Sequence, residues 1–234
     1  MQIYSDETKF MIITTRQKHQ REPYVFLNGN SIEQVSSIKF LGLVVDDRLS
    51  WSSHIKTLTS TIAKATYQLA RIKNFINADC RKTFYYAYIH SRLEYGLMLY
   101  GGAAANQLKP LKSLQKRATR LIAMTSLPCS GDVFKSLGIL PLGSLVNLQR
   151  SILIFKSMHN KVPAHITALF TPSSCGNSRF KLPLPRVDIF KNQSVSFGAV
   201  IYWNSLPLSL RNSAAELSLK VFRTELKAHA LSTV

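Results

Sequence analysis

Two adjacent aspartates, Asp46 and Asp47, form the only neighbouring acid pair beyond the first residues of the chain. Two carboxylates at the end of a strand can hold Mg²⁺ for phosphoryl transfer, but a third carboxylate normally completes such a site. No third carboxylate lies nearby in the sequence. Aspartate is also favoured near the N-terminus of a helix, where the helix dipole attracts negative charge. We therefore interpret the pair as a polar turn between a strand and a helix, and we assign no metal ligand.

The histidines and the common enzyme motifs indicate no catalytic site. No two of the six histidines lie four residues apart, so each is interpreted as structural or superficial. His54 is the most interesting of them, because it opens a helix beside Trp51. The sequence has no nucleophile elbow, no phosphate-binding glycine loop and no dinucleotide-binding glycine motif. We therefore expect no catalytic residue and no cofactor.

Cysteine usage and hydropathy predict an intracellular protein. Cys80, Cys129 and Cys175 lie far apart, which argues against a zinc knuckle or a disulfide scaffold and fits a reducing compartment. The first residues are too polar for a signal peptide, and no apolar run reaches the roughly 18 residues that span a bilayer. Nucleus and cytoplasm both remain open, and no membrane partner is expected.

The charge of the chain is its most informative property. Thirty Lys and Arg face twelve Asp and Glu, which gives a formal net charge of +18. Such an excess opposes compaction and favours a polyanionic partner, of which nucleic acid is the first choice and an anionic membrane surface the second. A charge that serves solubility alone stays open as an alternative. Carboxylates are absent from three long stretches, 48–78, 95–131 and 133–187.

Basic residues at helical spacing within these stretches are the candidate nucleic-acid-binding residues. The segment 107–120 is the strongest, because its cations would line one helical face with no acid to pair with them. A solvated helix face is the alternative. Tyr85, Tyr86, Tyr88 and Tyr95 could stack on bases, although their spacing favours core positions. The candidate cations are Lys56, Lys64, Arg71, Lys109, Lys112, Lys116, Arg117 and Arg120, with Lys73 considered as a further member of the first row.

The pattern of apolar residues predicts a mainly α protein with a small N-terminal β element (an α+β fold). Strands are expected near 9–15, 24–28 and 37–45, with a turn at Asn28-Gly29-Asn30 and an interruption at Gly42. Helices are expected at about 50–74, 77–100, 106–124, 131–137, 141–160, 196–205 and 214–231. The expected organisation is a β element at 1–47, a helical region at 48–170, a linker at 171–193 and a C-terminal helical segment at 194–234.

Several motifs follow one another in a fixed order. They are Lys39-Phe40-Leu41-Gly42 followed by Asp46, Leu49, Trp51, His54 and Ile55; Tyr88-Ile89 followed by Leu93-Glu94-Tyr95-Gly96; Leu114-Gln115-Lys116-Arg117-Ala118 with Arg120 and Ile122; Leu137-Gly138-Ile139-Leu140-Pro141-Leu142; and Trp203-Asn204-Ser205-Leu206-Pro207 with Phe222 and Leu226-Lys227. This order resembles the region after the polymerase palm in reverse transcriptases of non-LTR retrotransposons, notably jockey-like elements. The resemblance extends over nearly the whole chain, and Asp6 to Met11 partly resembles the last palm segment.

The resemblance implies a C-terminal portion of an RNA-directed DNA polymerase: the end of the palm, a thumb and a helical C-terminal region. In that family the catalytic aspartates lie upstream, so no catalytic residue carries over and Mg²⁺ belongs to the full-length enzyme only. Phe40, Leu41 and Gly42 would form a primer-grip-like hairpin. The expected partner is RNA or an RNA/DNA duplex, and the fragment would lack the upstream palm and fingers. The alternatives are a non-functional retroelement remnant or a basic helical interaction module.

Overall fold

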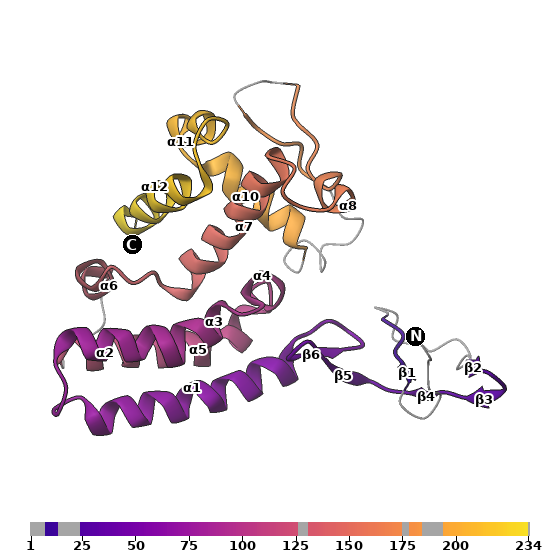
Figure 1. Ribbon diagram of the computed structural model, residues 1–234, viewed down its shortest axis with the longest axis horizontal. Coiled ribbons are helices and arrows are strands. Elements are labelled where there is room, and N and C mark those ends of the chain that lie inside the picture. Colours follow the sequence, from indigo (N-terminus) through magenta and orange to yellow (C-terminus); the bar gives the residue numbers. More distant parts are fainter. Residues whose placement is uncertain (1–7, 14–23, 126–130, 175–177, 184–193, 234) are drawn as a thin grey trace. The chain divides into compact units, whose positions relative to one another are not determined.

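The computed structural model describes residues 8–13, 24–125, 131–174, 178–183 and 194–233. The described residues are mostly helical, with short strands near the N-terminus, which confirms the predicted fold class (Figure 1). The chain divides into two compact units, Met1–Thr57 and Leu58–Val234. The boundary falls inside the first long helix.

The N-terminal unit contains three separate two-stranded pairings among its described residues. Strand β1 (Lys9–Phe10) pairs in parallel with β4 (Glu33–Gln34), and β2 (Phe26–Leu27) forms a hairpin with β3 (Asn30–Ser31). The predicted turn at Asn28-Gly29 is confirmed, with positive φ angles of 51° and 82°. Of the strands predicted at 9–15 and 24–28, each pairs over two residues only among the described residues, and 14–15 lie outside them.

The hairpin that follows is the most regular part of this unit. Strand β5 (Ser37–Phe40) pairs antiparallel with β6 (Leu43–Asp46), so Ser37 lies opposite Asp46 and Phe40 opposite Leu43. Leu41 and Gly42 form the two-residue turn with φ angles of 46° and 82°. Positive φ at both positions is the geometry that two-residue hairpins require, and glycine adopts it without strain. The interruption expected at Gly42 is therefore the turn of a hairpin.

The first helices of the larger unit are α1 (Ser52–Ile72), α2 (Ala78–Tyr85), α3 (Ser91–Glu94), α4 (Leu97–Tyr100) and α5 (Ala105–Ala123). The prediction of one continuous helix at 77–100 is wrong, because this segment is divided at two places. A π-helical turn, η2 (Tyr86–His90), separates α2 from α3, and Gly96, at a φ of 67°, separates α3 from α4. These pieces still bury one continuous stripe: Tyr85, Ile89, Leu93, Leu97 and Tyr100. Helices α2 and α5 pack against each other.

Helix α7 is the centre of the remaining fold. It runs over Leu142–Met158 after a short α6 (Gly131–Leu137), and both helices were predicted closely. It contacts α4, α5, α8 (Ala164–Thr167), α10 (Val195–Ser205) and α12 (Leu219–Ser232). Helical spacing predicts one buried stripe on this helix, made of Leu145, Leu148, Ile152, Phe155 and Met158. Because α7 has neighbours on several sides, Val146 and Ile154 are buried as well, whereas Met158 is only half-buried.

The C-terminal helices close over an aromatic cluster. Trp203 is fully buried, its Nε1 donates a hydrogen bond to the Ser178 carbonyl at 2.9 Å, and its ring lies 5.9 Å from that of Phe222. The Phe222 ring stacks on Phe155 at 4.7 Å. The helix predicted at 214–231 begins later than expected, as α12, which Ser218 caps through the Val221 amide, and the short helix α11 (Leu208–Ser213) before it was not predicted.

Part of the predicted linker and of the palm-like start lies outside the described residues. Of 171–193, the described part contains a bridge between Pro172 and Phe180. The sequence pattern also predicts one strand near 187–190 within this linker, and that segment lies outside the described residues. The four-part organisation stays a prediction. No single helix among the described residues has the length and hydropathy of a membrane span; the bent pair α6 and α7 passes only when both are taken together across a 56° bend.

Candidate nucleic-acid interface

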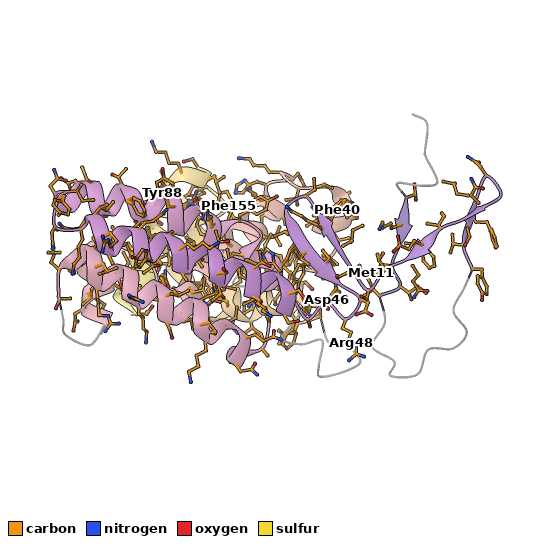
Figure 2. The ribbon with its side chains drawn as sticks, turned by 90° about the horizontal axis from the view of Figure 1, so that it is seen from below. Met11, Phe40, Asp46, Arg48, Tyr88 and Phe155 are labelled. Carbon is orange, nitrogen blue, oxygen red and sulfur yellow. The ribbon has the colours of Figure 1, made fainter. Side chains whose placement is uncertain are left out.

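The turn between β6 and α1 is organised by the carboxylate of Asp46. Its Oδ1 accepts hydrogen bonds from the amides of Arg48 (3.2 Å) and Ser50 (2.8 Å). Its Oδ2 accepts from the Ser50 hydroxyl (3.1 Å) and the Trp51 amide (2.8 Å). Asp46 therefore fixes the hairpin to the start of α1, as the polar-turn interpretation predicted (Figure 2). Since both oxygens already face donors, this carboxylate does not fit a Mg²⁺ ligand.

His54 continues the same connection from the helix side. The Val44 amide donates to its Nδ1 at 3.4 Å, and its ring lies edge-on to Trp51 at 6.3 Å. Burial lowers the pKa of His54 below its ordinary value of 6.5. Trp51 and Ile55 are buried too. The motif from Lys39 to Ile55 thus positions a hairpin on a helix, and no group of three or more possible metal ligands occurs among the described residues.

The turn end of the hairpin is apolar and exposed. Phe40 is 63% exposed and Leu41 74% exposed, with Gly42 beside them in the turn. The predicted primer-grip-like residues therefore lie together at one tip.

Helix α1 has one basic face and one buried face. Lys56, Lys64 and Arg71 are exposed at helical spacing, and Tyr67, 60% exposed, lies between the last two. The opposite face buries Leu58, Ile62, Ala65 and Leu69, and the helix contains no acidic residue. Tyr67 was missed by the sequence reasoning, although its position three residues after Lys64 and four before Arg71 was the available clue.

Helix α5 repeats this division. Lys109, Lys112, Lys116 and Arg117 are exposed and Arg120 is half-buried, whereas the opposite face buries Leu108, Leu111, Gln115, Ala118, Thr119 and Ile122. The helix contains no Asp or Glu. Thus the cations predicted for α5 do share one side of the helix.

Lys73 lies elsewhere than expected. It falls in the turn after α1, and together with Arg117 and Arg120 it lines a cavity of about 380 Å³. Its membership of the row formed by Lys56, Lys64 and Arg71 is therefore corrected. The structure brings Arg117 and Arg120 of the predicted set to this cavity and leaves the other predicted cations along the two helix faces.

The predicted base-stacking tyrosines divide between core and surface. Tyr85 is fully buried and accepts a hydrogen bond from Gln115, while Tyr86 is half-buried. Tyr88 and Tyr95 are 48% and 57% exposed. Tyr88 also packs on Phe84 at a distance of 4.6 Å between ring centroids.

Comparison with known proteins gives matches to polymerases of mobile elements. The chain is 30% identical over 105 residues to the RNA-directed DNA polymerase from mobile element jockey of Drosophila melanogaster, 25% over 108 residues to the probable polymerase from transposon X-element, and 29% over 99 residues to that from transposon BS, both also of Drosophila melanogaster. These matches cover 43%, 45% and 41% of this chain, less than the motif order suggested, and 11% to 12% of the relatives' length. No protein-family model and no solved structure matches.

The similarity agrees with the family that the motifs indicated. The identity is modest, and the matches span a small part of each relative. They show which proteins this chain resembles, and they do not assign it the activity of a whole enzyme. The curated homologues of this chain are RNA-directed DNA polymerases of jockey-like and other non-LTR retrotransposons.

Proposed function

We propose that this chain is the thumb-like, nucleic-acid-binding part of a non-LTR retrotransposon RNA-directed DNA polymerase. It holds template–primer duplex through the basic faces of α1 and α5, and another part of the polymerase supplies the chemistry. The observation that carries this proposal is the pair of acid-free helices whose exposed cations lie opposite their buried faces.

The two basic faces suit a phosphate backbone. At 1.5 Å per residue, Lys56 to Arg71 extends roughly 22 Å and Lys109 to Arg120 roughly 16 Å. A duplex carries one charge about every 1.7 Å along its axis when both strands are counted, so a row of this length can reach several phosphates. Phosphate contacts of this kind position a duplex without reading its sequence. Binding should therefore tolerate any sequence and weaken with salt.

The hairpin adds a second kind of contact. Phe40 and Leu41 present apolar surface that can lie against the end of a primer, and Asp46 anchors the hairpin at its other end. Mg²⁺ belongs to the polymerase site, and the occupied oxygens of Asp46 do not fit it. Removal of divalent metal with a chelator is therefore expected to leave duplex affinity unchanged.

A duplex titration tests the proposal. The full chain is titrated with a labelled RNA/DNA duplex over a salt series, together with the charge-reversed variant Lys109→Glu/Lys112→Glu/Lys116→Glu. The slope of log affinity against log salt should fall by about one for each phosphate that the variant no longer neutralises, hence by about three. The matched control reverses three exposed cations on neither helix: Lys135→Glu, Lys161→Glu and Lys181→Glu.

Two results would contradict the proposal. One is wild-type affinity that does not change with salt, and the other is an equal decrease of affinity in the α5 variant and the control. A folded chain that binds no duplex at low salt would favour the remnant or the protein-interaction module. Primer extension by this chain with Mg²⁺ should be blank, and measurable extension would assign it the chemistry.

A further inference from the structure

The cavity at the C-terminal ends of α1 and α5 differs from the two helix faces because basic residues from both segments line it. It is lined by Lys73, Arg117, Arg120, Leu121, Met124 and Thr125, all within the larger unit. We call it the three-cation cleft. None of these lining residues is acidic, so no carboxylate among them neutralises the charge within the cleft.

Arg81 makes this position suitable for an anion. The C-terminal ends of helices carry partial negative charge, which would repel a phosphate. The Arg81 guanidinium donates to the carbonyls of Lys73 (2.9 Å) and Ile76 (2.7 Å) beyond the end of α1, and to that of Ile122 (3.1 Å) in the last turn of α5. Its positive charge therefore offsets both helix ends.

Backbone amides also occupy a carbonyl at the C-terminal end of α5. Met124 adopts a left-handed conformation with φ 53°, and the amides of Met124 and Thr125 both donate to the Arg120 carbonyl. This terminal geometry satisfies carbonyls that would otherwise point out of the helix end. The charged groups that line the cleft are then the amino group of Lys73 and the guanidinium groups of Arg117 and Arg120.

The size and the apolar wall indicate a ligand larger than a phosphate alone. At about 380 Å³ the cleft lies within the range of small-molecule sites, which is roughly 300–1,000 Å³. Leu121 and Met124 provide apolar surface beside the three cations. We propose that the three-cation cleft binds one backbone phosphate of a nucleic-acid strand together with its adjoining nucleoside. This inference rests on the proposed function, and it specifies one convergent subsite within it.

The salt dependence of duplex binding distinguishes two arrangements of cations: three cations that share one phosphate, and three cations that each contact a separate phosphate. Counterion release counts the phosphates neutralised rather than the cations that neutralise them. Lys73→Gln/Arg117→Gln/Arg120→Gln should therefore weaken duplex binding at least about fivefold while the salt slope falls by about one only. The comparison variant Lys109→Gln/Lys112→Gln/Lys116→Gln, with the same number of charges removed, should lower the slope by about three.

A mononucleotide tests the cleft without a duplex. Adenosine 5′-monophosphate should bind the wild type more tightly than inorganic phosphate, and this binding should disappear in the cleft variant and persist in the comparison variant. Tighter binding of inorganic phosphate, or of phosphatidylserine vesicles in place of nucleotide, would overturn the assignment to a nucleic-acid strand.

The outcomes distinguish this inference from the proposed function. A slope change of about three in the cleft variant, or no change in affinity, refutes the convergent subsite even when the wild type binds duplex. Absence of salt-dependent binding in the wild type refutes the proposed function instead. Because Arg117 is exposed, Arg117→Gln alone is expected to fold normally and to reproduce part of the decrease in affinity. An unchanged affinity in that variant contradicts the inference.

Discussion

Replacement of Gln115 by leucine tests how α5 is held in the core. Gln115 is 1% exposed, and its Nε2 donates to the Tyr85 hydroxyl at 3.0 Å and to the Leu140 carbonyl at 2.9 Å. Its Oε1 accepts from the amide of Leu142, the first residue of α7, at 2.8 Å. One amide therefore links α5 to α2 and to the start of α7.

The expected destabilisation follows from the groups that Gln115→Leu leaves without partners. The carbonyl of Leu140 and the amide of Leu142 both become buried and unsatisfied, and each such group costs about 1–3 kcal/mol. Added apolar burial by leucine offsets part of this cost. We expect a decrease of about 3 kcal/mol in the free energy of unfolding, which is a large share of the roughly 5–15 kcal/mol typical of domains.

Urea unfolding followed by far-UV circular dichroism measures this decrease. Burial raises the pKa of Tyr85 above its ordinary value, so its hydroxyl stays protonated throughout the neutral range of the assay. The matched control is Gln107→Leu on the same helix, because the side-chain oxygen of Gln107 has no hydrogen-bond partner among the described residues. The control should not lower stability, because it removes a buried oxygen that has no hydrogen-bond partner among the described residues. A decrease below about 1 kcal/mol for Gln115→Leu, or equal decreases in both variants, would refute the reasoning.

Three further changes test other contacts. Gly101→Ala should destabilise the chain by about 1–3 kcal/mol in thermal melts, because a Cβ there meets the Leu97 carbonyl and lies 2.6 Å from Val146 Cγ2. The control Gly143→Ala should stabilise slightly, because a Cβ there meets nothing within 4 Å. Stability changes of the same sign in the two variants would contradict this prediction. Asp46→Asn should speed amide hydrogen exchange at Ser50 and Trp51 whereas Asp47→Asn should not, and unchanged exchange would remove Asp46 from the turn. Burial lowers the pKa of His54 in the folded chain, so the unfolded chain binds a proton at His54 more readily. The free energy of unfolding should therefore fall as pH drops from about 7.5 to about 5.5. The variant His54→Gln should reduce this pH dependence.

Local signals explain why some elements were predicted closely. Helix α6 at Gly131–Leu137 and helix α5 with Pro110 in its early turns follow from residues within the elements themselves. At 37–45 the residues alone predicted one strand interrupted at Gly42, and the hairpin with its tip at Leu41-Gly42 was implied by the family resemblance. The strand predicted from Lys9 was too long, because its length depends on a partner, β4, that lies more than twenty residues away in the chain.

Packing explains most of the errors among the helices. The interruption of the helix at 77–100 includes a π turn that lets Tyr85, Ile89 and Leu93 share one buried stripe. A single stripe was predicted for α7, but neighbours on several sides bury Val146 and Ile154 as well. The spacing of apolar residues along a helix indicates that one face is buried. It does not indicate how many other helices pack around that helix.

The sequence by itself determined the excess of positive charge, the acid-free stretches and the helix faces on which the cations lie, because these depend on composition and on the fixed period of the helix. Only the tertiary structure decided that Gln115 belongs to the core and that Lys73 joins Arg117 and Arg120 in the three-cation cleft. Arg81 donates a hydrogen bond to the carbonyl of Ile122, which lies 41 residues away in the chain. The C-terminal ends of α1 and α5 meet beside this hydrogen bond. Contacts across such separations depend on how the helices pack, which no local spacing of residues specifies.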